Sequence, residues 1–166
     1  MKWLFWTAAS LISVVVLLSV IGVLMPRTQS FTRSVRIPDP PQTVWSVLTD
    51  CTAEPYWRPE VKSCQALPTE DGHPVFRLMS SHGGSTEVEV YETIPSQNLG
   101  VRFLNLPAGG QLSWIFNLTP FQGGTQVSLT QNDSIGDLPA RIFFRASVRA
   151  QVADAFLREL AQDFKK

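Results

Sequence analysis

Hydrophobic and polar positions divide the chain into a long apolar stretch and a region of shorter alternating segments. The apolar stretch, Trp3–Met25, has 23 residues without a charge. As a helix it would be about 35 Å long, enough to cross a hydrocarbon core of about 30 Å. Pro26 would end that helix because proline has no amide N–H. The pattern predicts a transmembrane anchor over residues 1–26, followed by one domain over residues 27–166.

A cleaved signal peptide is the alternative for the same stretch. The apolar part of a signal peptide usually runs only about 7–15 residues, and Met25–Thr28 does not resemble a small-residue cleavage site. We therefore expect an uncleaved single-pass anchor in a membrane. Lys2 precedes it and several arginines follow it, so the positive-inside count leans only slightly toward a cytoplasmic domain.

The alternation after this stretch predicts a strand, two short helices, six strands and a long helix. Phe31–Ile37 alternates as the first strand. Asp39 is placed to cap the helix that follows, with Pro40 in its first turn and Gln42 reaching back as in a capping box. Turn sequences such as Gly83-Gly84 separate the later strands, as in antiparallel hairpins. These strands are expected at Ser63–Leu67, Val75–Ser80, Ser85–Ile94, Leu99–Leu106, Gln111–Thr119 and Thr125–Gln131, and the long helix begins at Asp137.

Every second residue of these strands is apolar, which predicts one apolar face of a sheet. Its members include Phe76, Leu78, Val88, Val90, Val101, Phe103, Leu112, Trp114, Phe116, Leu118, Val127 and Leu129. The long helix carries an apolar stripe at spacings of three and four. The stripe consists of Ile142, Ala146, Ala150, Ala153, Leu157, Leu160 and Phe164. Large residues facing small ones are compatible with a filled core or with space for a guest molecule.

Composition removes several classes of function. The chain has 14 Lys and Arg against 14 Asp and Glu, which argues against a nucleic-acid partner, because phosphate contacts need a clustered basic excess. His73 and His82 lie next to turn sequences and are expected to be exposed. Cys51 and Cys64 are compatible with a disulfide in an exported domain or with two packed thiols in a cytoplasmic one. No P-loop, dinucleotide, nucleophile-elbow or metal motif is present, so we expect no cofactor and no metal.

Two segments carry a family resemblance. The helix Val44–Asp50, followed by Tyr56-Trp57-Arg58-Pro59-Glu60-Val61, and the amphipathic C-terminal helix resemble the START-like or SRPBCC superfamily, in its polyketide cyclase/dehydrase and lipid-transport branch. The resemblance covers roughly Phe31 to Phe164. It implies an α+β helix-grip fold, in which a curved antiparallel sheet surrounds the long C-terminal helix and leaves an apolar cavity. A family so broad in function does not assign a reaction.

Charges on the long helix are placed against its macrodipole. Arg141, Arg145 and Arg149 recur every four residues near its N-terminus, where like charges repel each other and the dipole. We therefore expect compensation from outside the helix. Arg149 borders the alanine stripe and could meet the anionic group of a ligand or lipid. The alternative is solvation, or pairing with surface acids such as Glu87 or Glu89, which should face water because Val88 and Val90 face inward.

These observations predict a membrane-anchored protein that binds a hydrophobic small molecule or a lipid in the cavity. The ligand-binding residues expected from the sequence are Phe76, Leu78, Phe103, Leu112, Trp114, Phe116, Ala146, Arg149 and Ala150. The alternative is a polyketide cyclase/dehydrase-type enzyme acting on a hydrophobic or aromatic substrate. That function needs a titratable group inside the cavity, and the sequence places none there. A module that binds a protein partner is a third possibility.

Overall fold

The part of the chain that the computed structural model describes is residues 13, 28–69, 72–106, 110–134 and 146–165, with the side chains of residues 146–150 outside this description. The predicted order of elements is confirmed within it. The elements are β1 (Thr28–Ile37), α2 (Pro41–Thr49), α3 (Glu54–Trp57), β2 (Val61–Leu67), β3 (Val75–Ser80), β4 (Ser85–Ile94), β5 (Asn98–Leu104), β6 (Gln111–Phe121), β7 (Gly124–Ser134) and α5 (Ala146–Asp163). The segment 135–145, where the long helix was expected to begin, lies outside the described residues.

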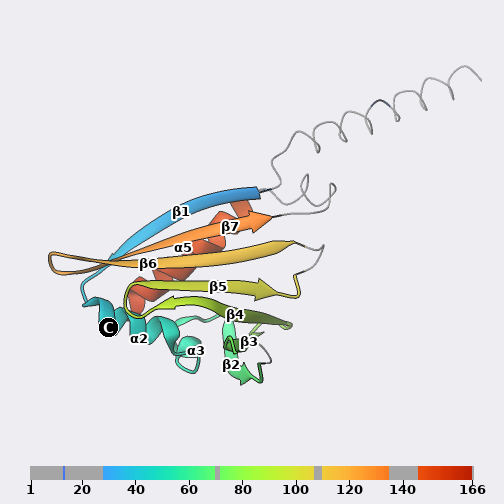
Figure 1. Cartoon of the computed structure of the whole chain (residues 1–166), viewed down its shortest axis with the longest axis horizontal. Coiled ribbons are helices and arrows are strands. Elements are labelled where there is room, and N and C mark those ends of the chain that lie inside the picture. Colours follow the sequence, from blue (N-terminus) through green and yellow to red (C-terminus); the bar gives the residue numbers. More distant parts are fainter. Residues whose placement is uncertain (1–12, 14–27, 70–71, 107–109, 135–145, 166) are drawn as a thin grey trace, which may run out of the picture.

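The strands form one seven-stranded antiparallel sheet in the order β1-β7-β6-β5-β4-β3-β2 (Figure 1). Strands β2 to β7 follow one another as neighbours, as the predicted hairpins require. Strand β1 returns to the far edge and pairs with β7, so that Val35 lies opposite Val127. The first and last strands are therefore adjacent, and together they carry the surface against which α5 packs.

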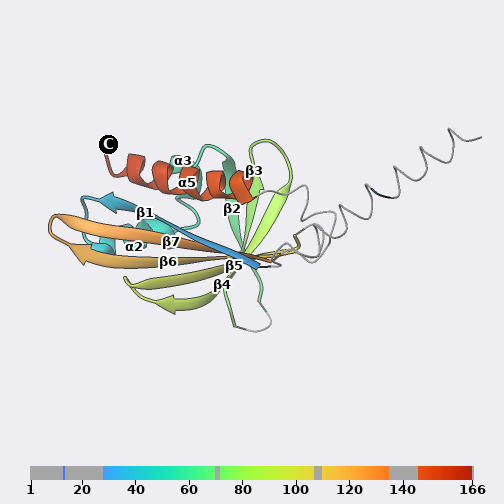
Figure 2. The same cartoon turned by 90° about the horizontal axis from the view of Figure 1, so that it is seen from above.

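Helix α5 runs along one face of the sheet (Figure 2). On its inner side Ala153 and Leu160 have no exposed surface, and they belong to the same buried cluster as Val127 and Leu129 of β7. Each large aliphatic side chain buried in this way contributes about 1.5–3 kcal/mol to folding. The curved sheet and the C-terminal helix confirm the predicted helix-grip arrangement.

The start of α2 differs from the prediction. Its N-cap residue is Pro40, and no side chain caps the helix, so the expected roles of Asp39 and Gln42 are wrong. Pro41 occupies the first turn, where the lack of an N–H leaves one fewer donor to satisfy. The carbonyl of Asp39 instead accepts a hydrogen bond of 2.7 Å from the hydroxyl of Thr125, which ties the end of β1 to β7.

One glycine is required where the β6–β7 hairpin passes the end of β1. Gly124 has φ +154°, and a Cβ built on it would lie 2.0 Å from the carbonyl oxygen of Ile37. No side chain fits at that distance. The close approach of the two backbones therefore depends on glycine at this position.

The predicted membrane anchor, Trp3–Met25, lies outside the described residues apart from Ser13. Within the described ranges, the structure contains no helix that is long and apolar enough to span a membrane. The division into an anchor over residues 1–26 and a domain over residues 27–166 stays a prediction.

Candidate functional site

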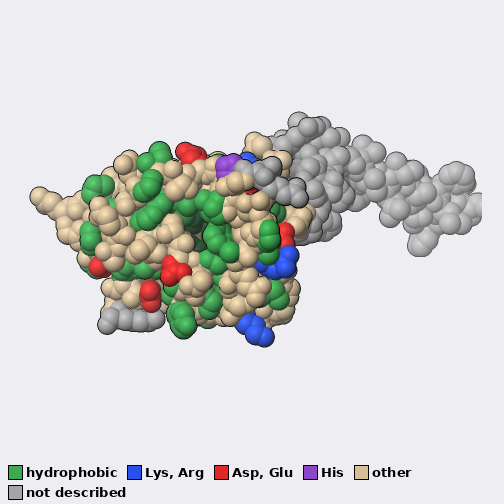
Figure 3. Space-filling view, turned by 60° about the horizontal axis from the view of Figure 1, so that its bottom comes forward, with side chains coloured by type: hydrophobic (Ala, Val, Ile, Leu, Met, Phe, Trp, Pro, Cys, Tyr) green, Lys and Arg blue, Asp and Glu red, His purple; other side chains and the backbone are tan. Residues whose placement is uncertain are grey.

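A cavity of about 360 Å³ lies between the sheet, the segment α2–α3 and α5. Its volume falls within the range of roughly 300–1,000 Å³ that is typical of small-molecule sites. Figure 3 shows a hollow on this face of the molecule, surrounded by hydrophobic side chains, with acidic side chains beside it. The lining consists of Trp45, Leu48, Thr49, Cys51, Glu54, Arg58, Cys64, Pro74, Phe76, Leu78, Val88, Val90, Thr93, Pro95, Leu99, Val101, Phe103, Trp114, Phe116 and Phe156.

Packed aromatic rings form one wall of the cavity. Trp114 meets Phe103 edge to face, with ring centroids 5.0 Å apart, and it meets Phe156 of α5 at 5.2 Å in the same manner. Phe116 lies 5.4 Å from Phe156. Edge-to-face pairs contribute about 0.5–1.5 kcal/mol beyond the area that they bury. The rings hold one another in place, so this wall is rigid before any ligand arrives.

A chain of two buried hydrogen bonds, which we call the polar relay, fixes the plane of the Trp114 indole. Its Nε1–H donates to Oε1 of Gln131 at 2.9 Å, and Nε2 of Gln131 donates to Oδ2 of Asp133 at 2.8 Å. Gln131 and Asp133 are only 1% and 5% exposed. Both face inward from β7, after the apolar positions Val127 and Leu129. Because a buried N–H without an acceptor is costly, the relay favours a single orientation of the indole.

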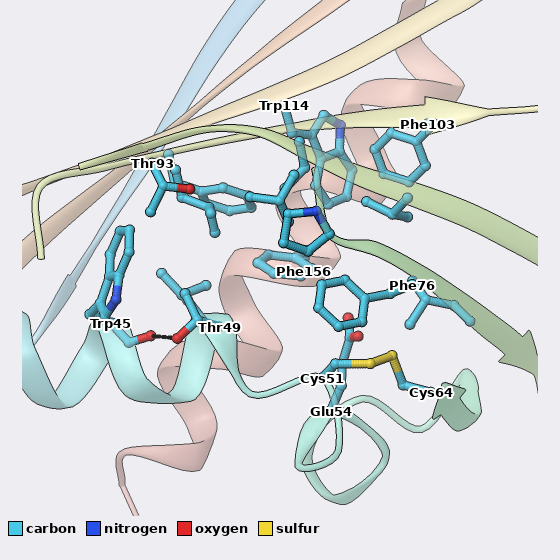
Figure 4. Close-up of a pocket in the computed structure, with 18 of the residues that line it drawn as sticks. Trp45, Thr49, Cys51, Glu54, Cys64, Phe76, Thr93, Phe103, Trp114 and Phe156 are labelled. Carbon is cyan, nitrogen blue, oxygen red and sulfur yellow. Dashed lines mark hydrogen bonds between the residues drawn. A yellow bond between two sulfur atoms is a disulfide. The ribbon is translucent and has the colours of Figure 1, made fainter. Parts of the chain in front are cut away.

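Two charged residues, one at the start of α3 and one directly after its end, reach the cavity. Glu54 and Arg58 form an ion pair one helical turn apart, and their side chains are only 14% and 11% exposed. Figure 4 shows the carboxyl group of Glu54 pointing into the pocket beside the Phe76 ring, whereas Trp45 and Thr93 lie on the opposite side. Burial raises the pKa of Glu54, and the neighbouring Arg58 acts against this by favouring the carboxylate.

Further acidic groups surround Arg58. Its second terminal nitrogen lies 3.3 Å from Oε1 of Glu60, and its guanidinium carbon lies 5.0 Å from the centre of the Phe156 ring. Glu159 of α5 is close by, and burial together with repulsion from Glu60 raises its pKa. Among the described residues, Nε of Arg58 and Oε2 of Glu159 are buried without a hydrogen-bond partner. Glu54 and Arg58 line the cavity, whereas Glu60 and Glu159 lie beside Arg58 outside the lining. We call these four residues the polar corner.

A disulfide joins Cys51 to Cys64, whose Cα atoms are 5.6 Å apart. The sequence left this pairing open. The bond connects the segment after α2 to β2 and closes a loop that contains all of α3. Both cysteines line the cavity, so the crosslink holds Glu54 and Arg58 against the pocket.

The structure brings together five of the nine ligand-binding residues expected from the sequence. These are Phe76, Leu78, Phe103, Trp114 and Phe116, which all line the cavity. Leu112 does not line it and instead packs against the edge of the hydrophobic core. The side chains of Ala146, Arg149 and Ala150 lie outside the described residues. Whether any of the nine binds a ligand stays a prediction.

Sequence reasoning missed the cavity residues that come from the helices. Phe156 is only 6% exposed and falls outside the predicted stripe, although it follows Ala153 by three residues and precedes Leu160 by four. That spacing could have identified it. Glu54 and Arg58 had a similar signal, since opposite charges four residues apart pair on a helix. The sequence analysis placed no titratable group in the cavity, whereas the structure places Glu54 and Arg58 in its lining.

Other polar residues lie away from the cavity. The expectation that Glu87 and Glu89 face away from the core is confirmed. Their partners are the strand residues Arg77, at 2.8 Å, and Arg102, at 3.3 Å. Asp154 of α5 pairs with Arg33 of β1 at 3.1 Å, so the compensation expected from outside the helix exists for this acid. His73 and His82 are exposed as predicted. The described residues include no group of three His, Cys, Asp or Glu side chains that could hold a metal ion.

Solved structures with the same architecture include proteins named as aromatase/cyclases. The di-domain ARO/CYC protein BexL from the BE-7585A biosynthetic pathway is 21% identical, with a TM-score of 0.68, over 87% of this chain and 52% of its own. This chain thus spans about half the length of that relative. The Zhui aromatase/cyclase from Streptomyces sp. R1128 is 21% identical over 83% of this chain and 94% of its own, with a TM-score of 0.64. Ara h 8.0201 is 13% identical over 82% of this chain and 97% of its own, with a TM-score of 0.66.

At these identities the likeness shows the fold alone. No functionally curated protein matches the sequence. The family model described as polyketide cyclase / dehydrase and lipid transport matches residues 28–165, which is nearly the whole region after the apolar N-terminal stretch. The chain therefore belongs to the polyketide cyclase / dehydrase and lipid transport family.

Proposed function

We propose that this protein binds a hydrophobic small molecule or a lipid in the cavity between the sheet and α5. The observation that carries the proposal is a cavity of about 360 Å³ whose lining is mostly apolar and aromatic. Burying a ligand there would contribute about 25 cal/mol for each Å² of apolar surface removed from water, less the cost of ordering both partners. The rigid aromatic wall reduces that ordering cost.

We further propose that Trp3–Met25 anchors the domain in a membrane. An anchor would keep the cavity beside a pool of membrane-dissolved molecules and so raise their local concentration. The disulfide between Cys51 and Cys64 supports an exported domain, because disulfides persist in oxidising compartments and are rare in the cytosol. This argument outweighs the slight lean of the flanking charges toward a cytoplasmic domain.

Native mass spectrometry of the full chain, extracted in a mild detergent, tests the binding function. A bound small molecule or lipid, retained at one copy per protein, would support it. The blocking variant is Thr93→Trp, which adds a large side chain at the exposed rim of the cavity, outside the core, and should reduce the bound fraction. The same adduct on this variant at equal occupancy would place the molecule elsewhere and contradict the proposal.

An enzyme of the polyketide cyclase/dehydrase type is the second candidate. The observation that favours it is the buried Glu54 carboxyl beside Arg58, in a cavity large enough for an aromatic substrate. A buried carboxyl whose pKa is raised is a candidate for a general acid or base. Two of the structural relatives are aromatase/cyclase proteins by name.

The two candidates differ in what Glu54→Gln would do. An enzyme would lose turnover of a poly-β-ketone substrate by about 10²–10⁴-fold when its general acid or base is removed. A binding protein would show no turnover before or after the change. Product analysis by liquid chromatography, on the unchanged protein and on Glu54→Gln, decides between the two functions.

A further inference from the structure

The polar corner of the cavity has an unusual balance of charge. Arg58 is the one cation among the described residues that line the cavity. Its two terminal nitrogens are already engaged, the first by Glu54 and the second by Glu60 at 3.3 Å. The guanidinium of Arg58 is therefore paired with two carboxyl groups before a ligand arrives.

A third acid makes the corner more negative. Glu159 reaches the same place from α5, where repulsion from Glu60 and attraction by Arg58 both act on it. The corner thus contains one guanidinium and three carboxyl groups. The sum of the charges is below zero as long as no more than one of the three carboxyl groups is protonated. Electrostatic interactions are stronger in such a half-buried place than in water, so this excess acts on any charged group that enters.

An anionic group has no suitable position in this corner. Of the three Arg58 side-chain nitrogens, only Nε has no hydrogen-bond partner among the described residues, and it is buried. Two arginines of neighbouring strands, Arg77 and Arg102, pair with Glu87 and Glu89 on the opposite face of the sheet. An anion would lose its hydration and meet carboxylates, which is unfavourable.

A hydrogen-bond donor, in contrast, finds an acceptor. The carboxyl group of Glu54 points into the pocket (Figure 4), and the Phe76 and Phe156 rings line the space around it. A carboxylate accepts from hydroxyl and ammonium groups, and aromatic faces also attract cations. The chemistry of the corner therefore favours a donor over an anion, and the suggestion that Arg149 meets an anionic group stays a prediction.

We propose that the cavity selects a mainly apolar ligand whose polar end is a hydroxyl or an ammonium group, and that it rejects carboxylates and phosphates. This proposal rests on the binding function proposed above and adds the chemical class of the ligand. The apolar body lies against the aromatic wall, and the donor points to Glu54.

Three probes with one apolar body test the proposal: 2-naphthylmethanol, 2-naphthylmethylammonium and 2-naphthoate. Each is titrated by calorimetry into the full chain held in nanodiscs of uncharged phosphatidylcholine, with empty nanodiscs as the blank. We expect 2-naphthoate to bind at least about tenfold more weakly than the other two, which is the size of one charge-assisted hydrogen bond. Equal or tighter binding of 2-naphthoate would overturn the proposal and leave the binding function standing. If no probe binds, both fail.

Glu54→Gln identifies the group responsible. It removes the carboxylate and frees one nitrogen of Arg58, so the preference against 2-naphthoate should shrink about tenfold. Glu87→Gln, on the outer face of the sheet, is the matched control and should retain the full preference. Glu60→Gln frees the other nitrogen of Arg58 and is measured alongside, in case Glu54→Gln does not fold. An unchanged preference in every folded variant of the polar corner would overturn the proposal.

Discussion

Phe156 holds the sheet, α3 and the cavity wall together, and its removal should have a measurable cost. Its ring centre lies 5.2 Å from those of Trp57 and Trp114 and 5.4 Å from that of Phe116. Replacing a buried Phe by Ala costs about 3–5 kcal/mol of unfolding free energy. Because one side of the ring faces the cavity and lacks packing partners there, we expect the Phe156→Ala cost near 3 kcal/mol.

The control lies one turn away on the same helix. Val152 is 49% exposed, so Val152→Ala should change the free energy of unfolding by less than about 0.5 kcal/mol. Urea unfolding of the full chain in detergent, followed by tryptophan fluorescence, measures both variants. Phe156→Ala should move the unfolding transition to a lower urea concentration without changing the dependence of the free energy of unfolding on urea. Equal stabilities of the two variants would refute the role given to Phe156.

Three further changes probe other parts of the structure. Glu159→Gln should stabilise the protein at pH 7 and reduce its loss of stability between acid and neutral pH. A carboxyl with a raised pKa binds its proton more tightly in the folded state, and this stabilisation is lost as the pH rises through that pKa. Thermal melting across pH checks this, and a wild-type pH profile in the variant would contradict it. Gln131→Leu should leave the Trp114 N–H without its acceptor and cost about 1–3 kcal/mol of unfolding free energy. The near-ultraviolet circular dichroism of the indole should change as well, and an unchanged spectrum would refute the claim that Gln131 fixes the orientation of the indole. Gly124→Ala should destabilise by more than Gly123→Ala, since only the former meets backbone, at 2.0 Å from the Ile37 carbonyl oxygen; equal melting temperatures would argue against this close approach.

Local pattern was sufficient for the elements of this fold and for much of its cavity. Strands β3 and β4 have the predicted bounds because turn sequences such as Gly83-Gly84 separate them from their neighbours. Period two also placed Phe76, Phe103 and Trp114 on the face that lines the cavity. The cap at Asp39 was predicted wrongly, because the proline that follows it takes over the start of the helix.

The burial of the polar corner was beyond the reach of the pattern. Glu54 begins a helix of four residues and Arg58 follows its last residue. Their spacing is that of an ion pair, but their burial depends on contact with α5 far along the chain. The same holds for Gln131 and Asp133, which are polar at positions where the alternation of β7 predicts apolar residues. Their burial is possible only because hydrogen-bond partners arrive from another strand or from each other.

Titration of the full chain with N-phenyl-1-naphthylamine, an uncharged fluorescent probe, tests the central claim most directly. The account predicts saturable binding at one site per chain, and loss of that binding in both Thr93→Trp at the rim and Val90→Trp inside the cavity. Melting temperatures of the same samples separate a filled cavity from a damaged fold, since overpacking of a core costs about 1–3 kcal/mol. Absence of saturable binding by the unchanged protein, or binding by both folded variants as tight as that of the unchanged protein, would contradict the claim that this cavity is a ligand site.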